Sequence, residues 1–159
     1  MDKSVLKSGL GNSMLLGIRH FGIVVLDIER SLYFYKKYFG FKVEKDADEQ
    51  GSFIEQILSI NGAHLRTVKL LSPVSEVMIE LVQYFAGGVV ENDNAINQVG
   101  PTHFAITVGN IDKLYAQMTS ENVQFLSKPT NSPDNYARVA FCRAPEGTYI
   151  EMVELLSGK

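Results

Sequence analysis

Cysteine is almost absent from this chain of 159 residues, and that absence limits its chemistry. Cys142 is the single cysteine, so no disulfide can form within the chain. One thiolate is also too few for a cysteine-based zinc site or an iron–sulfur cluster. Any metal ion bound here must therefore be held by nitrogen and oxygen atoms.

An excess of positive charge is missing as well. The 15 Lys and Arg residues against 18 Asp and Glu residues give a formal net charge of -3. A broad basic surface that neutralises phosphates is therefore not expected, which argues against nucleic acid as a partner. An anionic small molecule remains compatible with this composition, because a few local arginines can hold one.

Long hydrophobic runs are also lacking. The stretch MLLGIRHFGIVVL is interrupted by Arg19 and His20 and is shorter than the roughly 20 residues that a membrane-spanning helix requires. A secretory signal is not expected, because Asp2 lies where its basic region would be. We therefore expect a cytoplasmic protein with no membrane partner, and we interpret residues 1–14 as a flexible N-terminal lead-in.

The chain does contain an internal repeat. HFGIVVLDIER, which begins at His20, matches HFAITVGNIDK, which begins 83 residues later at His103. A second match, VMIELVQY with TYIEMVEL, aligns Glu80 with Glu151. The repeat predicts a first module over residues 15–86, a linker over 87–99 and a second module over 100–156. Modules this short rarely fold alone, so the two must pack together or exchange between chains.

Each half has the pattern of a strand, a helix and further strands. Asp27 is a candidate N-cap for a helix over residues 29–39 that ends at Gly40, and Asn110 is the candidate cap of a helix over 111–121. The remaining strand candidates are FKVEKD, HLRTVKLL and VMIELVQY in the first half and VQFL, RVAFCR and TYIEMVEL in the second. The predicted order is βαβββ, twice.

A histidine in the first strand and a glutamate in the last strand recur in both halves. Burial of a carboxylate in an apolar strand costs on the order of several kcal/mol unless a partner compensates it. If approximate two-fold symmetry relates the halves, His20, Glu80, His103 and Glu151 could converge on one point. Two imidazoles and two carboxylates suit a divalent Ni, Zn, Co, Mn or Fe ion. Taken singly, each of these residues is more often structural.

Four segments resemble the vicinal oxygen chelate superfamily, also called the glyoxalase/bleomycin-resistance/dioxygenase superfamily. They are IRHFGIVVLDIERSLYFYKKYFGFKV, MIELVQY, PTHFAITVGNIDKLY and RAPEGTYIEMVE. The resemblance implies an α+β fold in which two tandem βαβββ modules form a cup-shaped mixed sheet around a central cavity, with helices outside. It also implies that His20, Glu80, His103 and Glu151 bind one divalent metal ion.

The His, Glu, His, Glu pattern resembles that of bacterial glyoxalase I. Methylmalonyl-CoA epimerase is similar but often has glutamine at the position of Glu80. The resemblance implies a metal-dependent lyase or isomerase of lactoylglutathione lyase type, which transfers a proton through a metal-stabilised enediolate. Its substrate would be a 2-oxo hemithioacetal or an acyl thioester. Glu151 is the first candidate for the catalytic base and Glu80 the second. The family also makes a homodimer an option, because its modules pair within one chain or across two.

Three alternatives remain open. An acyl-CoA epimerase would use a closely related mechanism. A ring-opening dioxygenase would hold Fe(II) with two histidines and one carboxylate, and Glu80 argues against it because a fourth ligand fills a position that O2 or substrate needs. A drug-binding protein of bleomycin-resistance type would typically lack the metal ligands.

Several other side chains are weaker candidates. Glu55 could enter the cavity, although an exposed helical position is the commoner role. Arg66 and Arg138 lie near equivalent points of the halves and could bind a carboxylate or phosphate, although surface arginines are more common. We interpret His64 as a surface or structural residue. Lys69 and Lys128 are scattered basic residues near the expected cleft.

Overall fold

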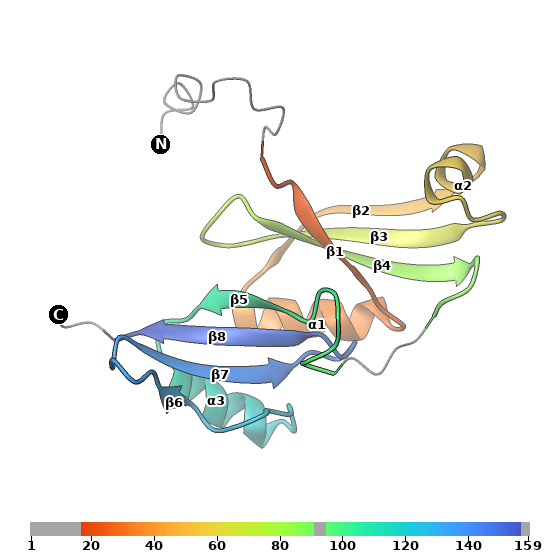
Figure 1. The fold of residues 1–159 in the computed structure, drawn as a ribbon. Helices are drawn as coiled ribbons and strands as arrows, with labels where there is room; N and C mark the ends of the chain where they lie inside the picture. The colour runs from red at the N-terminus through yellow and green to blue at the C-terminus, as the bar shows by residue number, and fades with distance from the viewer. Residues whose placement is uncertain (1–16, 91–94, 157–159) are drawn as a thin grey trace, which may run out of the picture.

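The computed structural model describes residues 17–90 and 95–156 (Figure 1). The predicted lead-in, residues 1–14, lies outside the described residues, as does part of the predicted linker. Within the described ranges the chain forms two four-stranded sheets and three helices, which confirms the predicted α+β class. No helix in this part of the chain is long and apolar enough to cross a membrane.

The first half contains four strands and two helices. Its strands are ordered β1-β4-β3-β2, with β1 parallel to β4 and the other neighbours antiparallel. Helix α2 is an addition to the predicted pattern. The elements are β1 (His20–Val24), α1 (Ile28–Phe39), β2 (Lys42–Gln50), α2 (Ser52–Leu58), β3 (His64–Leu71) and β4 (Met78–Ala86).

The second half repeats this topology. Its strand order is β5-β8-β7-β6, again with one parallel pair, β5 beside β8. The elements are β5 (His103–Thr107), α3 (Ile111–Ser120), β6 (Thr130–Asn131), β7 (Ala137–Arg143) and β8 (Tyr149–Leu155). Both halves therefore have the βαβββ plan that the repeat predicts.

Local capping residues set the ends of the helices as predicted. The Asp27 carboxylate accepts a hydrogen bond from the Arg30 amide, and the Asn110 side chain accepts one from the Lys113 amide. Each cap satisfies an amide that has no partner within its helix. Gly40 ends α1 with φ of 69°, a left-handed conformation that glycine adopts at little cost.

The predicted strand VQFL at residues 123–126 is not a strand of the second sheet. The segment makes one isolated bridge, Phe125 to Cys142, and the Leu126 amide donates to the Phe141 carbonyl. Pro129 follows closely and has no amide hydrogen, so it cannot donate to a continuing ladder. The edge strand of the sheet is instead the short β6.

One hydrophobic core extends through both halves. On the first sheet, Val68, Leu70, Ile79 and Leu81 are at most 3% exposed and belong to the same cluster as the buried residues of α1. The cluster continues into the second half, and its members there are Ile111, Met118, Ala140, Cys142, Ala144, Ile150 and Met152. Each large apolar side chain buried in this way contributes roughly 1.5–3 kcal/mol. The core therefore holds the halves together through the helix-covered faces of the sheets.

The opposite face of each sheet, here called its front face, carries the candidate metal ligands. Strand alternation places His20, Gly22 and Glu80 on the front face of the first sheet. The same alternation places His103 and Glu151 on the front face of the second sheet. The front faces thus separate the candidate chemistry from the core.

Candidate metal centre

The first ligand pair, His20 and Glu80, is formed by two parallel strands. Gly22 lies opposite Glu80 in the register between β1 and β4, and His20 is two residues earlier on the same face. His20 Nε2 is 3.0 Å from Glu80 Oε2. Gly22 leaves open space beside this pair, since a Cβ added there would meet no atom within 4 Å. His20 Nδ1 is buried and has no hydrogen-bond partner among the described residues.

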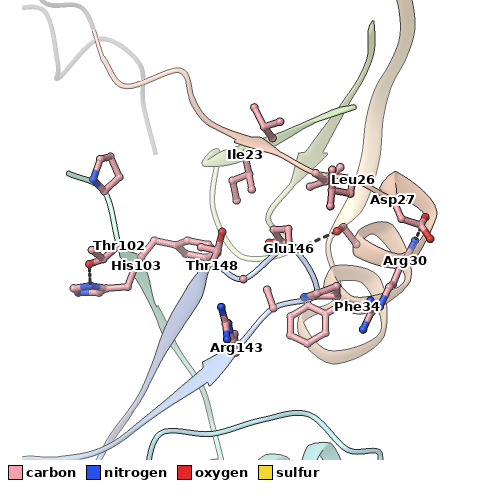
Figure 2. Close-up of a pocket in the computed structure, with 18 of the residues that line it drawn as sticks. Ile23, Leu26, Asp27, Arg30, Phe34, Thr102, His103, Arg143, Glu146 and Thr148 are labelled. Atoms are coloured by element: carbon pink, nitrogen blue, oxygen red, sulfur yellow. Dashed lines mark hydrogen bonds between the residues drawn. The ribbon is translucent and has the colours of Figure 1, made fainter. Parts of the chain in front are cut away.

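The second ligand pair, His103 and Glu151, occupies the equivalent strand positions in the second half. Ala105 lies opposite Glu151 in the register between β5 and β8. His103 Nε2 is 3.7 Å from Glu151 Oε2, which is too long for a direct hydrogen bond. The Thr102 hydroxyl is 3.0 Å from His103 Nδ1 and orients the ring (Figure 2). The ring therefore directs Nε2 toward the carboxylate.

The two pairs are not brought together within one chain. Among the described residues, no group of three or more His, Cys, Asp or Glu side chains is placed to hold a metal ion. A cavity of about 1260 Å³ between the halves is lined by both His20 and His103, but its lining includes neither Glu80 nor Glu151. A shared site of four ligands therefore stays a prediction.

Lys69 lies beside the first ligand pair, a position that was not predicted. In the register between β3 and β4, Lys69 lies directly opposite Glu80, and its Nζ is 3.0 Å from Glu80 Oε1. The corresponding place in the second half is taken by Phe141, which lies opposite Glu151 and whose ring centre is 5.4 Å from that of His103. The first pair is flanked by a cation and the second by an aromatic ring.

The two arginines at equivalent points of the halves form ion pairs with carboxylates of their own half. Arg66 donates to both carboxylate oxygens of Asp46, at 2.9 and 2.7 Å, and to Glu29 at 2.6 Å. These bonds hold the pKa of Asp46 below its usual value. Arg138 donates in the same manner to Asp112, which is the repeat equivalent of Glu29. Both guanidinium groups link a helix to its own sheet.

Two further candidates also have structural partners. Glu55 lies in α2 and accepts a hydrogen bond from the Gly62 amide at 3.2 Å. His64 Nε2 is 2.9 Å from Asp48 Oδ2, and its ring packs edge-on against Phe85. Glu55 thus fixes the connection to β3, and the structural interpretation of His64 is confirmed.

A polar contact between the halves was not predicted. The Tyr35 hydroxyl on α1 donates to Glu146 Oε1 at 2.5 Å, and the Ser31 hydroxyl donates to Glu146 Oε2 at 2.9 Å. Glu146 lies in the turn between β7 and β8 (Figure 2). Burial raises the pKa of Glu146, although the hydrogen bonds from Tyr35 and Ser31 act in the opposite direction. Burial raises the pKa of Tyr35, and the negative charge of the nearby Glu146 raises it further.

The donor atoms of the two pairs fit a divalent first-row metal ion. Each pair presents an imidazole Nε2 beside a carboxylate oxygen, and imidazole with carboxylate is a common ligand set for Zn, Ni, Co, Mn and Fe. The open space beside Gly22 leaves room for a further ligand. His20, Glu80, His103 and Glu151 are therefore chemically suited to hold such an ion.

Comparisons with known proteins give the family. The model of the Glyoxalase/Bleomycin resistance protein/Dioxygenase superfamily matches residues 17–152. A lactoylglutathione lyase of Schizosaccharomyces pombe is 28% identical over 142 residues, which are 86% of this chain and 46% of that enzyme. The chain thus spans about half the length of this curated relative.

Solved structures have the same fold. A glyoxalase family protein from Bacillus cereus superposes with a TM-score of 0.85 at 19% identity, covering 93% of this chain and 99% of that one. The trypanothione-dependent glyoxalase I of Leishmania major has a TM-score of 0.61 at 25% identity, covering 87% and 86%. By its sequence and its two βαβββ modules, the chain belongs to the glyoxalase/bleomycin resistance protein/dioxygenase superfamily.

Proposed function

We propose that this protein is a metal-dependent lyase or isomerase of glyoxalase I type. The observation that carries the proposal is the pairing of a histidine with a glutamate on the front face of both sheets. The similarity to a lactoylglutathione lyase supports it. The reaction would remove a proton from a carbon beside a substrate carbonyl. The proton would return to the neighbouring carbon in a small 2-oxo hemithioacetal, or to the same carbon in an acyl thioester.

In this proposal His20, Glu80, His103 and Glu151 hold one divalent metal ion. When bound, the ion supplies a Lewis acid that stabilises negative charge on substrate oxygens. The protein supplies the proton acceptor and the positions of the groups around it. Gly22 provides the space beside the ligands that a substrate needs.

We propose further that two copies of the chain build each site. The pairs lie in separate sheets, and both are partly exposed to solvent. The side chains of His20 and Glu80 are 26% and 16% exposed, and those of His103 and Glu151 are 41% and 26% exposed. Half-exposed apolar residues such as Val24, at 49%, lie on the same faces. A symmetric dimer would join the first pair of one copy with the second pair of the other, giving two sites.

Glu151 is better placed than Glu80 to act as the base. Both carboxylate oxygens of Glu80 have partners, Nε2 of His20 and Nζ of Lys69, each at 3.0 Å. The nearest ionic partner of Glu151 in the described part of the chain is His103, at 3.7 Å. A carboxylate with fewer partners moves and accepts a proton at a smaller cost. Glu80 is then chiefly a ligand.

Metal analysis of the purified protein tests the ligand set. We expect stoichiometric Ni, Zn, Co, Mn or Fe in the wild type and its loss in the His103→Ala and Glu151→Gln variants. His64→Ala is the matched control, because His64 pairs with Asp48 away from the ligands. A metal-free wild type that folds normally would refute the proposal.

Mixing two inactive variants tests the shared site. In a mixed dimer of His20→Ala and His103→Ala chains, one site carries both substitutions and the other carries neither. Random mixing should therefore restore about a quarter of the wild-type activity. If each chain builds its own site, the mixture stays inactive.

Substrate assays complete the test. Isomerisation of the hemithioacetal of methylglyoxal and glutathione should be measured beside exchange of the α-proton of methylmalonyl-CoA. Activity in the first assay alone favours the lyase, and activity in the second alone favours an acyl-CoA epimerase. Inactivity in both, with metal bound, would contradict the proposed reaction.

A further inference from the structure

Lys69 is a charged residue beside the first ligand pair, and the proposed reaction gives it no role. It stands on the central strand β3, directly opposite Glu80, and its side chain is 19% exposed. Among the described residues, Glu80 is its only carboxylate partner within 4 Å. A lysine ammonium has three donor hydrogens, so contact with Glu80 leaves donors for another oxygen.

The charges of the proposed site do not balance when Lys69 is included. A divalent ion with two carboxylates and two neutral imidazoles has no net charge. Lys69 adds one positive charge next to Glu80, at 3.0 Å. Charges at such separations interact strongly where burial limits solvent screening. A site of this composition favours a substrate whose reacting end carries one negative charge.

The two halves differ at the position of Lys69, so the two sides of the proposed site are chemically different. Lys69 lies opposite Glu80, whereas Phe141 lies opposite Glu151 and packs against His103. A substrate bound between the two pairs would meet a cation on one side and an aromatic ring on the other. An anionic group fits the side of Lys69, and an apolar group fits the side of Phe141.

We propose that Lys69 binds a substrate carboxylate on or next to the carbon that loses its proton. The inference rests on the proposed function and narrows its substrates to those 2-oxo hemithioacetals or acyl thioesters that carry a carboxylate at this position. Lys69 acts as a specificity-determining residue. It selects the charged substrate over a neutral one that presents the same oxygens to the metal.

Pyruvate and pyruvamide are suitable probes, because they present the same neighbouring oxygens and differ by one charge. Isothermal titration calorimetry on metal-loaded wild type, Lys69→Met and Lys69→Arg proteins would compare their affinities. We expect Lys69→Met to weaken pyruvate binding about tenfold or more, with pyruvamide binding unchanged and metal content retained. Lys69→Arg should keep most of the preference. Lys45→Met is the matched control, since Lys45 is the exposed neighbour of Lys69 on β2.

The outcomes separate this inference from the proposed function. A metal-free wild type overturns both. Equal weakening of pyruvate and pyruvamide by Lys69→Met, or no weakening, overturns the role of Lys69 and leaves the metal site standing. Loss of metal from the Lys69→Met variant, with metal retained in the wild type and in Lys69→Arg, also overturns the role of Lys69 in substrate binding. Lys69 would then serve only to hold Glu80.

Discussion

Replacement of Tyr35 by phenylalanine should weaken the joint between the halves. Tyr35 is fully buried, and its hydroxyl donates to Glu146 Oε1 at 2.5 Å. A hydrogen bond to a charged acceptor contributes about 1.5–3 kcal/mol. We therefore expect Tyr35→Phe to lower the free energy of unfolding by about 2 kcal/mol, and the melting temperature by roughly 4–8 °C.

The loss should grow with pH. Burial raises the pKa of Glu146 above its ordinary value of 4.5. The folded state therefore favours the protonated Glu146 carboxyl. This contribution to the free energy of unfolding is fully present below pH 4.5 and is lost as the pH rises through the raised pKa of Glu146. The Tyr35 hydrogen bond favours the ionised form and so lowers this pKa. Its removal raises the pKa of Glu146 further, so Tyr35→Phe should cost more stability at pH 8 than at pH 5.

Urea unfolding followed by circular dichroism at both pH values measures this difference. Tyr33→Phe is the matched control, because Tyr33 lies on the same helix but is 61% exposed, and its hydroxyl accepts a hydrogen bond from the exposed Lys37. The control should change stability by less than about 0.5 kcal/mol. An equal penalty at the two pH values, or a penalty no larger than that of Tyr33→Phe, would refute the reasoning.

Three other predictions concern single positions. Gly22→Leu should fill the space beside the first ligand pair and weaken metal or pyruvate binding at least about tenfold. Its thermal unfolding should show a stability change below about 1 kcal/mol. Unchanged binding would place the site elsewhere. Burial raises the pKa of the Cys142 thiol to about 12. At pH 8, iodoacetamide should therefore label the urea-unfolded chain but not the native protein. Rapid labelling of the native protein would contradict this. Asp27→Ala and Asn110→Ala should each cost about 1 kcal/mol in urea unfolding, because each removes one helix cap, and unequal costs would show that the repeated caps are not equivalent.

The sequence predicts those features that depend on neighbouring residues or on the repeat. Helix caps at Asp27 and Asn110 are local, and both are present. The repeat also shows a histidine in the first strand and a glutamate in the last strand of each half, and the structure adds that these two strands are parallel neighbours. Such features need no knowledge of how the halves pack.

Features that depend on register or on distant contacts could not be predicted. Lys69 faces Glu80 because of the exact pairing of β3 with β4, and a shift of one residue would place it on the opposite face. Tyr35 and Glu146 are 111 residues apart in the chain. The separation of the two ligand pairs depends on the orientation of the halves, which no single segment encodes.

The location of the two ligand pairs in different sheets has a consequence for measurement. If each site needs both copies of the chain, the number of working sites follows mass action. Activity per mole of protein should then fall on dilution below the dissociation constant of the dimer, and a substrate that bridges the copies should oppose this fall. The apparent kcat would then depend on protein concentration. A value measured at one concentration below the dissociation constant of the dimer would be lower than the kcat of a fully assembled site.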